Sequence, residues 1–131
     1  MIVGAGIDVA PISRVSRLVR DHAATLEQVF TEQERAFCEN GTSRHREARY
    51  AGIFAAKEAV MKALGTGWRS DVQFAHIETR DVAAPGEAVL RGPIRKVAHD
   101  LGVARILLSI AATADAAMAA AVATRGDNDA R

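Results

Sequence analysis

One segment, residues 54–67, constrains this chain more than any other. It reads Phe-Ala-Ala-Lys-Glu-Ala-Val-Met-Lys-Ala-Leu-Gly-Thr-Gly, an apolar helical run that carries one carboxylate and two ammonium groups, those of Lys57 and Lys62. Glu58 and Lys62 are four residues apart, so a helix places their side chains on one face. Gly65 predicts the helix end, because glycine tolerates the left-handed conformation common just past a helix.

Spacing alone leaves two interpretations of this segment open. An acid, a base and a flexible turn at one helix end could hold a metal-bound phosphate compound. Alternatively, Glu58 and Lys62 form an ordinary exposed ion pair in front of a capping glycine. Such pairs are common and stabilise a helix only weakly, so spacing alone favours the second interpretation.

The amino terminus supplies another carboxylate. Residues 1–9, Met-Ile-Val-Gly-Ala-Gly-Ile-Asp-Val, predict a short apolar strand with Asp8 near its end. Gly4 and Gly6 suggest a dinucleotide-binding turn, but the third glycine of that fingerprint is missing and the preceding strand is too short. We therefore reject a dinucleotide site. On its own, Asp8 is most simply a residue that caps the strand end.

Together, the two motifs resemble the holo-acyl-carrier-protein synthases, the small bacterial phosphopantetheinyl transferases. That family opens with a Gly-x-Gly-(Ile/Leu)-Asp strand and carries Phe-Ala-Ala-Lys-Glu-Ala-x-x-Lys-Ala-x-Gly-Thr-Gly in its long helix. The second motif is complete at residues 54–67. Residues 29–38 are similar to the family's second helix, and residues 87–93 and 101–109 to its last third. The resemblance therefore extends over most of the chain.

This resemblance implies a transferase that moves the 4′-phosphopantetheine arm of coenzyme A to a serine of an apo acyl carrier protein. It implies that Asp8 and Glu58 hold a Mg²⁺ ion that binds the pyrophosphate of coenzyme A; Mg²⁺ commonly takes its other ligands from water and substrate phosphates. Lys62 is expected to neutralise the pyrophosphate or to protonate the leaving group. Glu58 is expected to orient the base that receives the serine proton. A turn that lets backbone approach the cofactor completes the expected site: Gly65, Thr66 and Gly67.

The resemblance also implies a homotrimer, with each active site between two subunits. Arg14 lies six residues after Asp8, where the family usually has an arginine, so we expect it to contact the acidic surface of the carrier protein. Arg17 and Arg20 follow at three-residue steps on the same broad helix face, and for these two a solvated face is an equally good interpretation. Small alanine-rich strands near the carboxy terminus carry more apolar surface than one short domain can cover, which agrees with an oligomer.

Three positions depart from the family pattern. Pro11 stands where the family usually has a glutamate, Ile53 where it has an arginine, and Ala112 where it has the histidine of Ser-His-(Asp/Glu). Replacing arginine by an alkyl group removes a bidentate cation for phosphate. Two alternatives therefore stay open: a non-catalytic relative that binds coenzyme A or a carrier protein, and a transferase specialised for a polyketide or peptide synthase carrier domain.

Composition narrows the class of protein. The chain has 131 residues, 49% of them hydrophobic, which predicts one domain at 1–124 and a polar tail at 125–131. A net charge of +1 gives no reason to expect nucleic acid binding, and the single cysteine excludes an intrachain disulfide. No apolar run approaches the roughly 20 residues of a membrane helix. We therefore expect a cytoplasmic protein without membrane contact.

The remaining patterns predict an α+β fold of the 4′-phosphopantetheinyl transferase type, with a small antiparallel sheet packed against helices that include one long central helix. Thr31 and Glu34 match a capping box. Helices are expected to begin at Pro11 and Pro93, and a polar segment at 42–49 to lead into the long helix that ends near Leu64. A turn is expected at 83–86. The expected strands are residues 2–9, 72–79, 87–91, 106–111 and 117–123.

Overall fold

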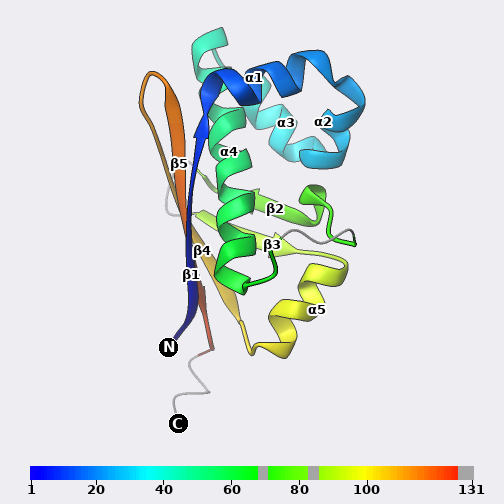
Figure 1. The fold of residues 1–131 in the computed structure, drawn as a ribbon, viewed down its shortest axis with the longest axis vertical. Coiled ribbons are helices and arrows are strands. Elements are labelled where there is room, and N and C mark those ends of the chain that lie inside the picture. Colours follow the sequence, from blue (N-terminus) through cyan, green and yellow to red (C-terminus); the bar gives the residue numbers. More distant parts are fainter. Residues whose placement is uncertain (68–70, 83–85, 127–131) are drawn as a thin grey trace.

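A five-stranded antiparallel sheet and one long helix form the centre of the molecule (Figure 1). The computed structural model describes residues 1–67, 71–82 and 86–126. The elements in chain order are β1 (Ile2–Pro11), α1 (Ile12–Asp21), α2 (Ala23–Val29), α3 (Glu32–Glu39), α4 (Ser43–Leu64), the 3-10 helix η1 (Phe74–His76), β2 (Ile77–Arg80), β3 (Gly86–Leu90), α5 (Pro93–Asp100), β4 (Arg105–Ala112) and β5 (Ala116–Thr124). The strand order is β1-β5-β4-β3-β2, with every described pairing antiparallel. The α+β prediction is confirmed.

Helix α4 lies across one face of the sheet and contacts β1, β5, β4 and β2. Its middle and last turns are almost entirely buried, because alanines alternate there with larger apolar side chains such as Ile53, Val60 and Leu64. The first three helices gather near the start of α4, and α5 lies near its other end (Figure 1). This arrangement buries one face of the sheet against α4.

Gly4 and Gly6 bring β1 unusually close to α4. A Cβ atom on Gly4 would lie 2.0 Å from the carbonyl oxygen of Ala63, and one on Gly6 would lie 2.1 Å from that of Ala59. Real Cβ atoms do not approach so closely, so any larger residue would push the strand away from the helix. The two glycines therefore serve helix packing, which supports rejecting the dinucleotide site.

Local signals in the sequence identified several element boundaries correctly. Thr31 and Glu34 form the predicted capping box at the start of α3. Gly65 ends α4 in the left-handed conformation, with φ of 68°. β4 and β5 pair as the predicted antiparallel hairpin. These features depend on neighbouring residues, which explains why the sequence predicts them.

Two predicted helix starts were wrong. Pro11 ends β1 and stands at the N-cap position, one residue before α1, so it does not open the helix. The polar segment at 42–49 is not a lead-in, because Thr42 caps α4 and the helix begins at Ser43. Helix α2 was not predicted. Its seven residues lack a side-chain cap that would mark its beginning.

The predicted strand at 72–79 was also wrong in its first half. Residues 74–76 form η1, and the strand β2 begins only at Ile77. The ammonium of Lys57 donates hydrogen bonds to the carbonyls of Phe74 and Ile77, which holds this segment in a turn. Residues 83–85 of the predicted turn and residues 127–131 of the predicted tail lie outside the described residues. Arg125, the first residue of the predicted tail, is joined to the amino terminus, because its backbone N–H donates to the carbonyl of Met1 at 2.9 Å.

The sheet face turned away from α4 is apolar and solvent-exposed. Ile7 and Val9 of β1 are 68% and 58% exposed, and Leu107 and Met118 are 38% and 37% exposed. Val9 pairs directly with Met118, so these side chains share one surface. Within the described part of the chain, no helix covers this face (Figure 1). This surface, defined by Ile7, Val9, Leu107 and Met118, is the outer sheet face.

Candidate functional site

Asp8 and Glu58 meet where β1 crosses α4. Asp8 points from the strand toward the helix and is 9% exposed. The pKa of Glu58 is raised to about 7, first by burial and then by the hydrogen bond and the charge repulsion that Asp8 exerts on it. The ammonium of Lys62 and the guanidinium of Arg14 act in the opposite direction. Two acidic side chains that are far apart in the sequence thus lie within hydrogen-bonding reach, and their negative charges repel each other when both are ionised.

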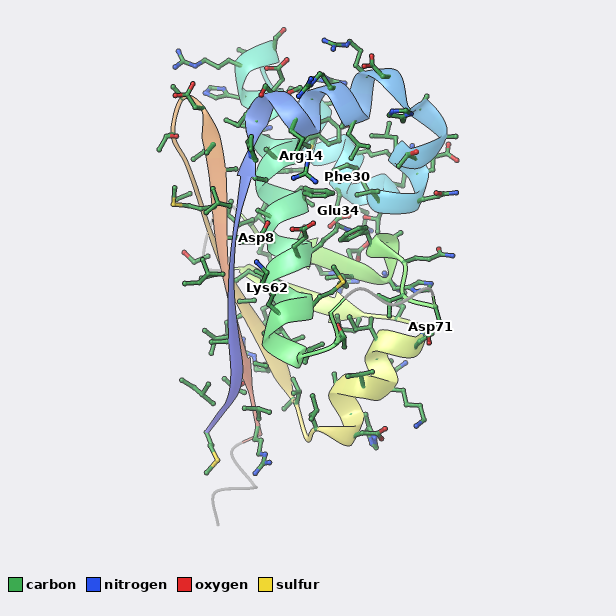
Figure 2. All side chains as sticks on the ribbon, in the orientation of Figure 1. Asp8, Arg14, Phe30, Glu34, Lys62 and Asp71 are labelled. Atoms are coloured by element: carbon green, nitrogen blue, oxygen red, sulfur yellow. The ribbon has the colours of Figure 1, made fainter. Side chains whose placement is uncertain are left out.

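Lys62 makes the third contact of this site. Its Nζ lies 2.9 Å from Oδ1 of Asp8 and 3.0 Å from the carbonyl oxygen of Ile7. Figure 2 shows Lys62 beside Asp8, between β1 and α4. The hydrogen bond to Asp8 raises the pKa of Lys62. Among the described ion pairs Lys62 joins Asp8 and not Glu58, so the ordinary exposed helix pair is not the one that forms.

The turn after α4 keeps its backbone open. Gly65 and Gly67 both adopt positive φ, 68° and 58°, and apart from their chain neighbours no atom of the described residues lies within 4 Å of a Cβ built on either. Thr66 is anchored to the helix, because its N–H donates to the carbonyl of Met61 at 3.2 Å. Three of the four predicted cofactor-binding residues, Gly65, Thr66 and Gly67, therefore form an open turn just after the fourth, Lys62.

Arg14 lies on the exposed side of α1 and lines a cavity of about 780 Å³. Arg17 and Leu18 of the same helix, with Phe54 of α4 and Phe74 of η1, also line it. Of the described α4 residues, Phe54 lines this cavity, one helical turn before Glu58, and neither Glu58 nor Lys62 does. Arg20 does not line this cavity and is paired with Asp21 instead, at 3.1 Å. Arg14 thus both lines the cavity and acts on the charge of Glu58, whereas Arg17 lines the cavity alone.

Lys57 has a different environment from Lys62, although both belong to the same motif. Its side chain is fully buried, and Nζ lies 2.7 Å from Oε1 of Glu34. Oε2 of Glu34 accepts from the N–H and the hydroxyl of Thr79, at 2.8 and 2.7 Å. Burial lowers the pKa of Lys57, and the charge of Glu34 opposes this shift. The sequence did not predict this network, because the pattern around Glu34 indicated only a helix cap and nothing near Lys57 indicated its partners.

The three positions that depart from the family pattern lie in two parts of the structure. Ile53 and Ala112 line one cavity of about 270 Å³ between α4 and β4, together with Ile110 and Ala111. Two positions where the family usually has an arginine and a histidine therefore share one apolar wall. Pro11 is separate from them, at the end of β1, where it pairs with Ala116.

The donor atoms around Asp8 suit a hard divalent cation. The site offers two carboxylates and the carbonyl of Ile7, all of them oxygen ligands. No group of three or more His, Cys, Asp or Glu side chains in the described residues could hold a metal ion. A pair of carboxylates nevertheless fits Mg²⁺, which is commonly held by one or two carboxylates plus substrate phosphates and water.

None of the described helices is long and apolar enough to cross a bilayer.

Comparison with known proteins agrees with this geometry. Residues 4–120 match the model of the 4′-phosphopantetheinyl transferase superfamily. The holo-[acyl-carrier-protein] synthase of Caldanaerobacter subterraneus subsp. tengcongensis is 35% identical over 132 residues, which cover 98% of this chain and 99% of that protein. The crystal structure of the Neisseria meningitidis holo-[acyl-carrier-protein] synthase is similar with a TM-score of 0.80 at 30% identity, covering 95% of this chain and 100% of that one. The Bacillus anthracis holo-(acyl-carrier-protein) synthase in complex with CoA (3′,5′-ADP) has a TM-score of 0.76 at 30% identity, covering 96% and 99%.

Proposed function

Because the chain belongs to the 4′-phosphopantetheinyl transferase superfamily, we propose that it transfers the 4′-phosphopantetheine arm of coenzyme A to a serine of an apo acyl carrier protein. The products are the holo carrier protein and adenosine 3′,5′-bisphosphate. One observation carries this proposal: Asp8, Glu58 and Lys62 converge from β1 and α4. The proposal includes one transferase domain at 1–124 and a cytoplasmic location.

Asp8 and Glu58 are the residues that would hold a Mg²⁺ ion. The ion would neutralise the pyrophosphate of coenzyme A and so favour departure of the bisphosphate. The pairing of two carboxylates supports this assignment: burial, and then the neighbouring Asp8, raises the pKa of Glu58 to about 7, and Lys62 pairs with Asp8 alone among the described ion pairs. A divalent cation would relieve that crowding.

Lys62 and the turn after α4 would bind the phosphate groups. The Lys62 side chain is 56% exposed, so its ammonium can reach a pyrophosphate oxygen or give a proton to the leaving group. Gly65, Thr66 and Gly67 offer exposed backbone at the end of the same helix. Glu58 would also orient the base that takes the proton of the attacking serine.

Arg14 would contact the carrier protein. Its residue is exposed on α1 and lines the cavity beside Phe54, and its charge acts on Glu58. A carrier protein with acidic side chains around its serine would therefore meet positive charge on its way to the carboxylates.

A cyclic homotrimer is the proposed assembly. The outer sheet face supports it, because four large apolar side chains from three neighbouring strands are exposed together there. Burying such a surface between subunits removes it from water. Light scattering at micromolar concentration should give three times the chain mass, and a monomer mass would contradict this assembly.

Mass spectrometry of carrier proteins tests the proposed reaction. The chain is incubated with coenzyme A, Mg²⁺ and several apo carrier proteins from fatty acid, polyketide and peptide synthesis. We expect at least one carrier to gain the phosphopantetheine mass. Glu58→Gln should slow this transfer by about 100-fold or more, because the amide is a poor Mg²⁺ ligand and several kcal/mol of charge stabilisation are lost.

The same experiment separates the alternatives. Transfer only to a polyketide or peptide carrier would indicate a specialised transferase. No transfer to any carrier, with unchanged circular dichroism, would indicate a non-catalytic relative and overturn the proposal.

A further inference from the structure

The contacts of Lys62 are made with the oxygens that a cation at this site would use. Its Nζ lies 2.9 Å from Oδ1 of Asp8, one of the two proposed metal ligands, and 3.0 Å from the carbonyl oxygen of Ile7. An ammonium group and a hard divalent cation both seek negatively polarised oxygen. The two cannot both sit in contact with one carboxylate oxygen without repelling each other.

Lys62 is also held loosely enough to leave this position. Its side chain is 56% exposed, whereas that of Asp8 is only 10% exposed, so the ammonium enters the site from the solvent side. The lysine partner of this ion pair is half-exposed, and a lysine stem is flexible. Lys57 differs on both points, since its buried ammonium is held by Glu34 and by two carbonyls.

We propose that the ammonium of Lys62 competes with a divalent cation for Asp8 and moves off this carboxylate when the cation binds. The inference rests on the proposed function, in which Asp8 and Glu58 hold Mg²⁺. The exchange has a consequence for the phosphate groups. The ammonium that leaves Asp8 is free to pair with the substrate phosphates. Binding of the divalent cation therefore places both the cation and the ammonium beside the same anion.

The first test measures metal affinity without coenzyme A. Mn²⁺ is titrated into the whole protein at pH 8.5 and free Mn²⁺ is followed by electron paramagnetic resonance. We expect Lys62→Met to bind Mn²⁺ about two- to fivefold more tightly than the unaltered chain, the range that loss of an exposed ion pair allows. Lys62 is exposed at the end of α4, and circular dichroism checks that the variant stays folded.

Arg14→Met is the matched control. Arg14 also places positive charge near Glu58, but it forms no described ion pair with Asp8. Its loss should tighten Mn²⁺ binding less than the loss of Lys62. Equal tightening in the two variants would show a general charge effect and overturn the competition, as would unchanged or weaker binding by Lys62→Met.

A second test observes the lysine itself. In protein with ¹⁵N-labelled lysine, Mg²⁺ addition should shift the ammonium resonance of Lys62 and leave that of Lys57 in place. A Lys62 resonance that does not respond, in protein that binds the metal, would overturn the exchange. If the unaltered chain binds neither Mn²⁺ nor Mg²⁺, the proposed metal pair itself fails, which is a different result from binding without competition.

Discussion

Helix α4 carries two clusters of carboxylate and lysine side chains that differ in balance and burial. The internal cluster consists of Glu34, Lys57 and Thr79, and the side chains of its ion pair are 1% and 0% exposed. There one positive charge meets one negative charge, and both carboxylate oxygens accept hydrogen bonds. The site cluster consists of Asp8, Glu58 and Lys62, and two carboxylates share one half-exposed ammonium.

The difference indicates which cluster serves the fold and which serves the chemistry. The balanced internal cluster joins α3, α4, η1 and β2, because Glu34 and Lys57 both bind backbone groups of other elements. Nothing in it is left to bind a further ion. The site cluster has a surplus carboxylate with a raised pKa and an opening to solvent, which is the arrangement expected where a cation or an anionic substrate will bind.

Removing the lysine of each cluster gives the largest expected contrast. Lys57→Met leaves Glu34 charged and buried without its partner, so we expect the free energy of unfolding to fall by about 3–5 kcal/mol. Lys62→Met removes a half-exposed ammonium and should lower the free energy of unfolding much less. Urea denaturation of both variants measures these values.

A double variant tests whether the unpaired charge of Glu34 causes the loss of stability in Lys57→Met. Glu34→Gln combined with Lys57→Met removes the unpaired charge and should recover part of the stability lost by Lys57→Met alone. Similar losses for the two single lysine variants would contradict the division into internal and site clusters.

The sequence predicted the parts of this comparison that depend on local pattern. The motif at 54–67 identified a helix with acid and base on one face, and the capping box at Thr31 located the start of α3. It could not predict the partners, because they come from distant segments. Asp8 and Lys62 are 54 residues apart, and Glu34 and Thr79 are 45 residues apart.

The directions of the two lysines of α4 could not be predicted from the sequence either. They are five residues apart, so they point about 140° away from each other around the helix. Only the packed structure reveals that Lys57 faces the interior and Lys62 faces β1. A helix that is buried around most of its circumference has no apolar stripe from which the direction of each side chain could be inferred.

The crowded carboxylates of the site cluster should also appear in the pH dependence of stability. The pKa of Glu58 rises from 4.5 to about 7 on folding. Between these values the folded protein binds more protons than the unfolded chain, so this group stabilises the fold below pH 4.5 and its contribution is lost as the pH rises through 7. In metal-free buffer, the unaltered chain should therefore lose more stability between pH 4.5 and 8 than Glu58→Gln. Urea midpoints across this range measure the difference, and parallel profiles would contradict the raised pKa.

The smallest expected effect concerns Arg14, whose charge acts on its surroundings through solvent. Arg14→Glu reverses an exposed charge on the rim of the cavity beside the site cluster. We expect the KM for the acyl carrier protein to rise roughly threefold to tenfold at low salt, because rim charges mainly change how an oppositely charged partner is attracted and oriented. The KM for coenzyme A should change less.

Salt and a matched variant decide whether Arg14 acts in this way. Exposed charges are screened beyond about 8–10 Å at moderate ionic strength, so added salt should reduce the effect of Arg14→Glu. Arg20→Glu makes the same charge reversal on the same helix, at a residue that lies outside the cavity and pairs with Asp21. Steady-state kinetics with an apo carrier protein should show a smaller change for Arg20→Glu. Equal changes in both variants would mean that only the net charge of α1 matters, whereas a change at Arg14 alone would support a contact between Arg14 and the carrier protein beside the site cluster.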